Sequence, residues 1–276
     1  MNQMPNNPSM VAWIVVFGCC LGILSSGDVY AQAQYTDAEM LMVVWETTPE
    51  AIKGLLPPPL EPYKKPLVTA FIADFPKTNF GVTYTMAGIF IVCEYNGEVG
   101  TYCVGMPEDD DIPVFLGRES QGYPKKMATL SLKREGDRID GWVERREIRI
   151  FELHATVNKQ RNFGEQKEAL REIFPDETKM DGVAFNIWAL RPPGDRQFTP
   201  KLLKQVTQFR PYLVEWCDTQ VVTRESPYDS PWGKLKVVRV LGSMYTRGNN
   251  TMLPAKVIAQ VDPKTYAPFA RMKYDW

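Results

Sequence analysis

The chain contains the stretch Gly117-Arg118-Glu119-Ser120-Gln121-Gly122-Tyr123-Pro124-Lys125-Lys126, in which two adjacent lysines follow a proline. A lysine acts as a nucleophile only when its amine is unprotonated, and at its reference pKa fewer than about 1 in 1,000 lysines are neutral at pH 7. Burial and a second nearby cation both disfavour the charged form. The pair therefore indicates an amine that could attack a ketone and form a Schiff base, although lysine pairs are also common on solvated surfaces.

The proline sets the geometry around the two lysines. Pro124 fixes its own φ and lacks a backbone donor, and Tyr123 before it is pushed towards an extended conformation. Neighbouring side chains of an extended segment point to opposite sides. We therefore expect Lys125 to face a pocket and Lys126 to face away, with its charge about one residue distant.

Two parts of this stretch, Gly117-Arg118-Glu119 and Tyr123-Pro124-Lys125-Lys126, resemble the active-site signature of the acetoacetate decarboxylase family. The resemblance implies that Lys125 forms the Schiff base and that Lys126 is its companion. Activation of a lysine by desolvation or by a neighbouring cation is the standard description of acetoacetate decarboxylase itself, so this mechanism comes with the resemblance. The similarity extends more weakly from about Tyr35 to the last strands, and upstream of the motif it runs through Tyr84-Thr85, Asn96-Gly97 and Met106.

The chain departs from the family pattern at three polar positions. The glutamate expected after the Tyr-Thr pair is Met86, a second acidic position is Phe71, and an arginine expected early in the domain is Ala38. Carboxylates and proton donors decide between decarboxylation, aldol addition and dehydration. The missing groups therefore argue against acetoacetate itself as the substrate, while the lysine remains.

Other relatives that keep the lysine and lack these carboxylates resemble aldolase–dehydratases acting on 2-keto acids such as pyruvate. Gln121 and Tyr84 match polar positions in that kind of site, and Tyr266 is a candidate aromatic proton donor. Each also fits a structural role, Gln121 as a hydrogen-bonding loop residue and the two tyrosines as core aromatics. The expected substrate pocket contains Arg118, Glu119, Met86, Met106, Phe71 and Tyr266.

Three functions are consistent with these residues. The first is a decarboxylase-like carbon–carbon lyase that acts on a keto acid through a Schiff base on Lys125, and the second is an aldolase–dehydratase that uses the same lysine. The third is a non-catalytic barrel that binds a small molecule. The resemblance implies a homo-oligomer, a small-molecule keto acid as partner, and no cofactor or metal.

The hydrophobic patterning predicts a β-rich α+β domain, and the resemblance implies an antiparallel sheet closed into a cone-shaped barrel with peripheral helices. Thr48 and Pro49 predict the start of a short helix, and a second helix is expected at residues 166–173. A hairpin is expected around Glu135-Gly136-Asp137, with strands at 130–133 and 138–143. The other expected strands are 40–45, 67–73, 89–95, 101–105, 112–116, 148–157, 183–190, 213–222, 235–241 and 256–261.

The cysteines and the single histidine exclude several kinds of site. If Asn96-Gly97 is a two-residue turn, Cys93 faces Gly100 and is out of register with Cys103, so no disulfide is expected between them. His154 is the only histidine, which excludes His-rich zinc sites. The acidic run Glu108-Asp109-Asp110-Asp111 is interpreted as a solvated loop between two strands.

The N-terminal segment forms a separate region. Residues 10–24 are an apolar run of the length of a secretory signal core, and Ala31-Gln32-Ala33 resembles a cleavage site, although no Lys or Arg precedes Lys53. We therefore divide the chain into residues 1–33 and a domain at 34–276, with no stable membrane span after removal of the signal. A cleaved signal would make the protein exported or periplasmic, and without one it would be cytoplasmic. The net charge of −1, without a basic stripe, argues against nucleic-acid binding.

Overall fold

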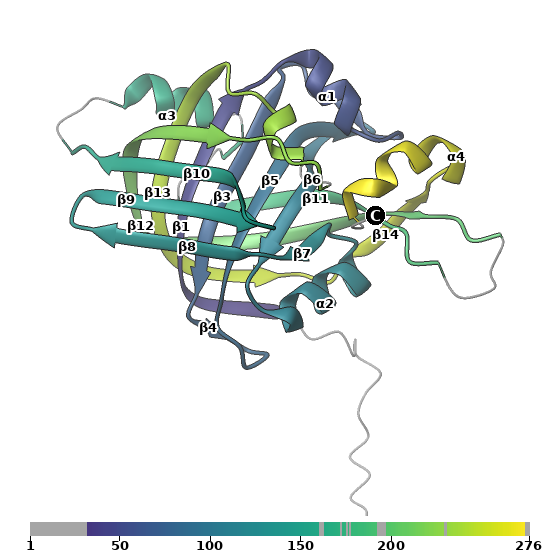
Figure 1. The fold of residues 1–276 in the computed structure, drawn as a ribbon, viewed down its shortest axis with the longest axis horizontal. Coiled ribbons are helices and arrows are strands. Elements are labelled where there is room, and N and C mark those ends of the chain that lie inside the picture. The colour runs from purple at the N-terminus through teal and green to yellow at the C-terminus, as the bar shows by residue number, and fades with distance from the viewer. Residues whose placement is uncertain are drawn as a thin grey trace, which may run out of the picture. The chain divides into compact units, whose positions relative to one another are not determined.

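A computed structural model describes residues 32–159, 163–171, 173–174, 176, 178–191, 197–228 and 231–273. Within these residues, seven strands close into a barrel (Figure 1). Six neighbouring pairs are antiparallel, and the parallel pair of β6 with β11 completes the mixed barrel. The predicted closed β-barrel is thus confirmed. In spatial order the strands are β11 (Met180–Trp188), β6 (Glu98–Glu108), β5 (Tyr84–Tyr95), β3 (Leu67–Phe75), β1 (Ala33–Glu46), β13 (Arg239–Met252) and β12 (Lys201–Thr223).

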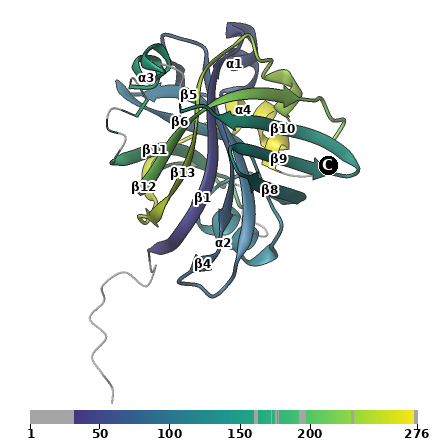
Figure 2. The ribbon, with the colours of Figure 1, turned by 90° about the vertical axis from the view of Figure 1, so that its left-hand side faces the viewer.

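A second sheet extends from the 23-residue strand β12. The first part of β12 pairs with β11, whereas its last part pairs with β10 (Ile148–Val157). Next to β10 lie β9 (Arg138–Arg145) and β8 (Thr129–Glu135), which form the predicted hairpin. Figures 1 and 2 show these strands as a separate layer beside the barrel, and β8 lies against β3 and β5.

The barrel strands are buried on both faces because one face meets this second layer and the other meets the barrel interior. Along β1, Leu41 and Val43 belong to the main core, together with Phe151 of β10. The alternate residues Met40 and Met42 line an internal cavity. Since successive side chains of a strand point to opposite faces, the near-continuous apolar run of β1 supplies both surfaces.

Short helices lie outside the strands (Figure 1). As predicted, α1 (Pro49–Leu55) begins after Thr48, whose Oγ1 accepts a hydrogen bond from the backbone N–H of Ala51 at 3.3 Å. The predicted second helix is also present, as α3 (Gly164–Arg171). No described helix is long and apolar enough to cross a bilayer. The remaining elements are β2 (Glu61–Pro62), β4 (Lys77–Thr78), β7 (Lys125–Met127), β14 (Lys256–Gln260), α4 (Pro263–Tyr266), and two 3-10 helices, η1 (Pro231–Lys234) and η2 (Ala267–Lys273).

The strand predicted at residues 112–116 is wrong, because this segment belongs to helix α2 (Asp111–Gln121). The Asp110 side chain accepts a hydrogen bond from the backbone N–H of Ile112 at 2.9 Å and caps the helix. Gly122 ends it in the left-handed conformation, with φ of 70°. These two caps favour a helix, although the apolar run between them is typical of a strand. The strand predicted at 235–241 is partly wrong, since β13 begins only at Arg239.

The Asn96-Gly97 turn connects β5 and β6 in the predicted register. Tyr95 pairs with Glu98, and Cys93 pairs with Gly100. Cys93, Cys103 and Cys217 are buried, and none of the three forms a disulfide among the described residues. Residues 1–31 of the predicted N-terminal signal segment lie outside the described residues.

Candidate active site

Lys125 is held at the wall of the barrel by the short strand β7. β7 pairs in parallel with β6, so that Lys125 lies opposite Met106, and the backbone N–H of Met106 donates to the carbonyl of Pro124 at 3.3 Å. Lys125 is 5% exposed and lines the cavity inside the barrel. Lys126 is half-buried and is not among the described residues that line this cavity.

The cavity has a volume of about 290 Å³ and a predominantly apolar wall. Phe71, Met86 and Met106 all line it. Two of the three residues that replace polar groups of the family pattern, Phe71 and Met86, therefore face the same space as Lys125, whereas Ala38 is not among the described lining residues. Phe71 stacks on Phe90, another lining residue, with ring centroids 5.9 Å apart. An amine in this position is surrounded by side chains that exclude water.

Glu108 contacts the Lys125 amine directly. Nζ of Lys125 lies 2.5 Å from Oε1 of Glu108, and Glu108 is fully buried. Burial raises the pKa of the Glu108 carboxyl, and the positive charge of Lys125 opposes that effect. The desolvation of this buried pair offsets much of its attraction, and burial favours the uncharged form of the Glu108 carboxyl.

The expectation of a solvated loop at residues 108–111 is therefore wrong for its first residue, and also for its last, because Asp111 begins α2. Glu108 ends β6, and its backbone carbonyl accepts from the N–H of Ala128 at 2.8 Å. Asp109 is exposed, with Oδ1 accepting from the N–H of Thr85 at 2.8 Å, and Asp110 caps α2. One signal for Glu108 was present in the sequence: strand alternation places it on the same face as Met106.

Two tyrosines lie beside this pair. Burial raises the pKa of both Tyr35 and Tyr84, and their hydroxyls interact with each other. The charges of Lys125 and Glu108 both act on Tyr35, which also lines the cavity. Both phenols stay protonated at neutral pH and can donate protons or hydrogen bonds. Tyr84 was a predicted site residue, whereas Tyr35 marked only the start of the resemblance.

Gly117 allows helix α2 to approach the lysine. A Cβ atom at this position would lie 2.2 Å from Cε and 2.7 Å from Nζ of Lys125. Only glycine, which has no Cβ atom, leaves the Lys125 amine in this position. The glycine of the Gly-Arg-Glu motif is thus a positioning residue for Lys125.

Replacing Gly117 with alanine should therefore move the amine while leaving the fold intact, since the atoms that must yield belong to a flexible side chain. We expect kcat/KM to fall by about 10²-fold, the effect of a misplacement of about 1 Å. The melting temperature should change little. Gly54→Ala in α1 is the matched control, because a Cβ there meets nothing within 4 Å. Equal activity of the Gly117→Ala and wild-type proteins would contradict this role.

The remaining predicted residues lie away from the cavity. Arg118 and Glu119 form an ion pair with each other at 3.5 Å on the partly exposed side of α2. Gln121 ends α2, with its buried Oε1 lacking a described hydrogen-bond partner. Tyr266 is 2% exposed and packs in the main core, on the other side of the barrel wall from the Lys125 cavity.

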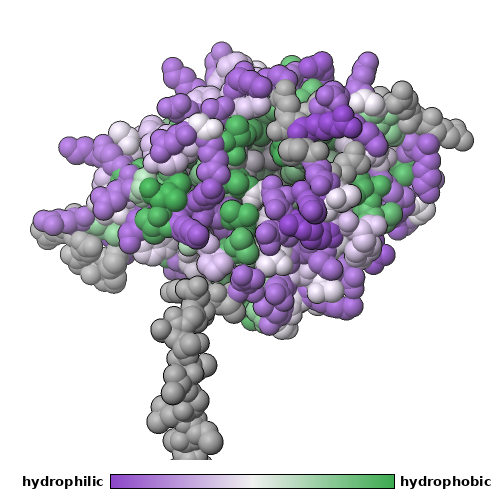
Figure 3. Space-filling view, turned by 180° about the vertical axis from the view of Figure 1, so that it is seen from behind, coloured by the Kyte–Doolittle hydropathy of each residue, from purple (hydrophilic) through white to green (hydrophobic). Residues whose placement is uncertain are grey.

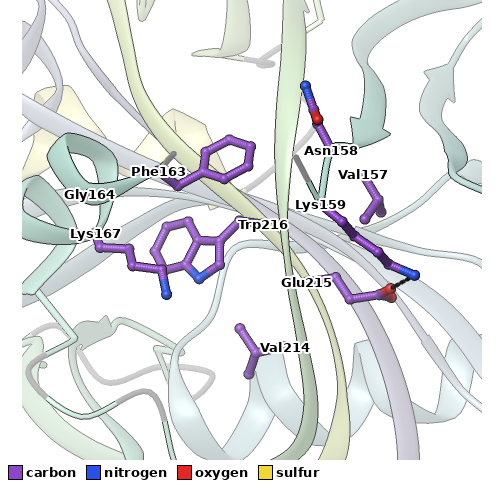
Figure 4. A pocket seen from close by; sticks show the side chains of 9 residues that line it. All are labelled: Val157, Asn158, Lys159, Phe163, Gly164, Lys167, Val214, Glu215 and Trp216. Carbon is purple, nitrogen blue, oxygen red and sulfur yellow. Dashed lines mark ion pairs between the residues drawn. The ribbon is translucent and has the colours of Figure 1, made fainter. Parts of the chain in front are cut away.

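A second pocket lies between β12 and the start of α3 (Figure 4). Figure 4 shows Lys159 directed at Glu215, with Nζ 3.9 Å from Oε1, and Lys167 beside the indole of Trp216. The side chain of Lys159 is 73% exposed. Its amine is therefore hydrated, and this pocket lacks the dry environment that distinguishes Lys125.

The sequence model of the acetoacetate decarboxylase family matches residues 25–261. The chain belongs to this family. Acetoacetate decarboxylases of Burkholderia vietnamiensis and Burkholderia ambifaria are each 36% identical to it over 118 residues, which is 42% of this chain and 47% of theirs. The matched region thus spans about half the length of these relatives.

Solved structures of an acetoacetate decarboxylase and of another enzyme share this fold. Acetoacetate decarboxylase from Legionella pneumophila superposes with a TM-score of 0.72 at 19% identity, covering 87% of this chain and 94% of that one. The enduracididine biosynthesis enzyme MppR complexed with pyruvate gives a TM-score of 0.65 at 18% identity, covering 86% of this chain and 93% of that one. At these identities the likeness establishes the barrel fold alone.

Proposed function

We propose that this protein is a carbon–carbon lyase that acts on a keto acid through a Schiff base on Lys125. The observation that supports it most is the Lys125 amine, buried in an apolar cavity and 2.5 Å from a buried carboxylate. Membership of the acetoacetate decarboxylase family supports an enzyme of the decarboxylase-like kind.

The reaction begins when Glu108 takes a proton from the Lys125 ammonium. The neutral amine attacks the ketone carbon, and loss of water gives an iminium ion. In a 3-keto acid the bond between the α-carbon and the carboxylate carbon then breaks. CO₂ leaves, and the electron pair of the broken bond moves into the iminium to form an enamine. The neighbouring phenol of Tyr35 or Tyr84 protonates the enamine carbon, and water releases the ketone and restores the amine.

An aldolase–dehydratase using the same lysine is the second candidate. Among the described residues that line the cavity, Asp181 is the only carboxylate, and it lies on β11 rather than beside Lys125. Apart from Glu108, the groups beside Lys125 that can transfer a proton are tyrosine hydroxyls, which suit the proton transfers of aldol addition and dehydration. The fold shared with MppR, solved with pyruvate, supports the same alternative.

Borohydride trapping tests the proposal. Incubation with a keto acid and borohydride should give a secondary amine whose mass appears on the peptide that contains Lys125. Absence of any adduct with a panel of keto acids and ketones would instead favour a non-catalytic binding barrel. Release of CO₂ from 3-keto acids, compared with formation of an enone from pyruvate and an aldehyde, separates the two enzymes.

A further inference from the structure

The cavity that contains Lys125 is elongated along the barrel strands. On β6 its wall runs from Met106, which lies opposite Lys125, back to Thr101, Gly100 and Val99. Met106 and Thr101 are five residues apart, which is about 16 Å along a strand. The cavity is therefore a channel that follows β6, with the amine near one end.

The channel carries charge only at its ends. Among its described lining residues, Lys125 is the only cation and Asp181 the only anion. Asp181 is half-exposed and forms an ion pair with Arg210. Between these ends the wall consists largely of Phe, Met and Val side chains, including Phe90, Val92 and Met180. A charged group in the middle of the channel would lose its hydration without finding a counter-ion.

Seen from behind, the molecular surface is mostly hydrophilic, with apolar residues in separate small patches (Figure 3). The apolar wall around Lys125 is an internal feature, because it lines a cavity inside the barrel and Lys125 itself is 5% exposed. An apolar channel that ends at a nucleophile is the arrangement that binds the tail of a substrate and presents its head to the reacting group.

We propose that the substrate is a 3-keto acid whose ketone carbon carries an unbranched apolar tail, which lies in this channel. The assignment rests on the proposed function, because the head group is placed by imine formation at Lys125. At about 30 Å³ for each non-hydrogen atom, the channel holds at least about ten such atoms, which leaves room for a tail of about four or more carbons. Acetoacetate, with a methyl tail, leaves much of the channel unfilled.

The test measures kcat/KM for 3-keto acids whose tails grow from one to eight carbons. Each added methylene should raise kcat/KM about fourfold while the tail remains inside the channel, so that a five-carbon tail exceeds acetoacetate by about 10²-fold. Equal kcat/KM across the series, or a preference for acetoacetate, would overturn the assignment of the channel.

A substitution at the far end supplies a second readout. Ala184 lines the channel and pairs with Thr101, so Ala184→Leu shortens the space for the tail. The advantage of the longest tails over acetoacetate should fall by at least about tenfold. Ala267→Leu, at an exposed position, is the matched control. Retention of the wild-type length profile in Ala184→Leu would contradict the proposal.

Binding of 3-hydroxy acids of the same lengths separates failure of the channel from failure of the Schiff base, because these compounds have no ketone carbonyl that could form an imine. If calorimetric affinity rises with tail length but no keto acid is trapped on Lys125, the channel assignment stands and the Schiff base is wrong. If keto acids are trapped on Lys125 but neither affinity nor kcat/KM depends on the tail, the Schiff base stands and the channel assignment is wrong.

Discussion

Lys125→Met is expected to abolish both borohydride trapping and turnover. Removal of a covalent nucleophile typically lowers kcat by about 10⁴- to 10⁶-fold, and methionine keeps the length and apolar contacts of the lysine stem. Lys133→Met is the matched control, because Lys133 is an exposed lysine of β8. It should retain wild-type activity and the adduct. Retention of more than about 1% of kcat in Lys125→Met would exclude a Schiff base at this position.

The same substitution also tests the buried pair through stability. Without Lys125, Glu108 has no described partner for its carboxylate, and breaking a buried ion pair typically costs about 3–5 kcal/mol. The pKa of Glu108 is already raised by burial, so the carboxyl can take up a proton and avoid part of this cost. We therefore expect a lower melting temperature that recovers as the pH falls. Lys125→Arg keeps the positive charge and should lose activity without this pH-dependent destabilisation.

The sequence identified Lys125 and much of the barrel because those signals are local. The Tyr-Pro-Lys-Lys motif fixes an extended segment, and the Asn96-Gly97 turn sets the pairing of β5 with β6 to the residue. The strand predicted at 112–116 is wrong, although the capping residues of α2, the helix that forms there instead, are local signals too. The apolar residues Ile112, Phe115 and Leu116 indicated a strand, yet all three are exposed side chains on α2. Their hydrophobicity therefore carried no information about a buried strand.

Glu108 could not be assigned from its neighbours in sequence, because its environment depends on a long-range pairing. Three aspartates follow it directly, and such a run is typical of a solvated loop. Only the parallel pairing of β6 with β7 brings Lys125 against it, and burial on both sides then isolates the pair from water. Tyr35 depends in the same way on distant parts of the chain, since its hydroxyl donates to Sδ of Met252 at 3.4 Å. Lys125 was therefore predictable as a site residue from its local sequence, whereas the buried carboxylate beside it and one of the two phenols were not.

Glu108→Gln is expected to lower kcat by about 10²- to 10⁴-fold, the usual contribution of a general base, while leaving the fold intact because the side chains have the same shape. In the wild type, Glu108 must be ionised to accept the lysine proton. Activity should therefore fall as the pH falls through the pKa of Glu108, which burial places above the usual carboxyl range. In the variant, the proton has to leave to solvent, so activity should rise with pH and recover partly in alkaline buffer. Asp111→Asn, in the same acidic run but exposed, should keep the wild-type profile. A Glu108→Gln protein with unchanged kcat and an unchanged acid limb would show that Lys125 loses its proton by another route.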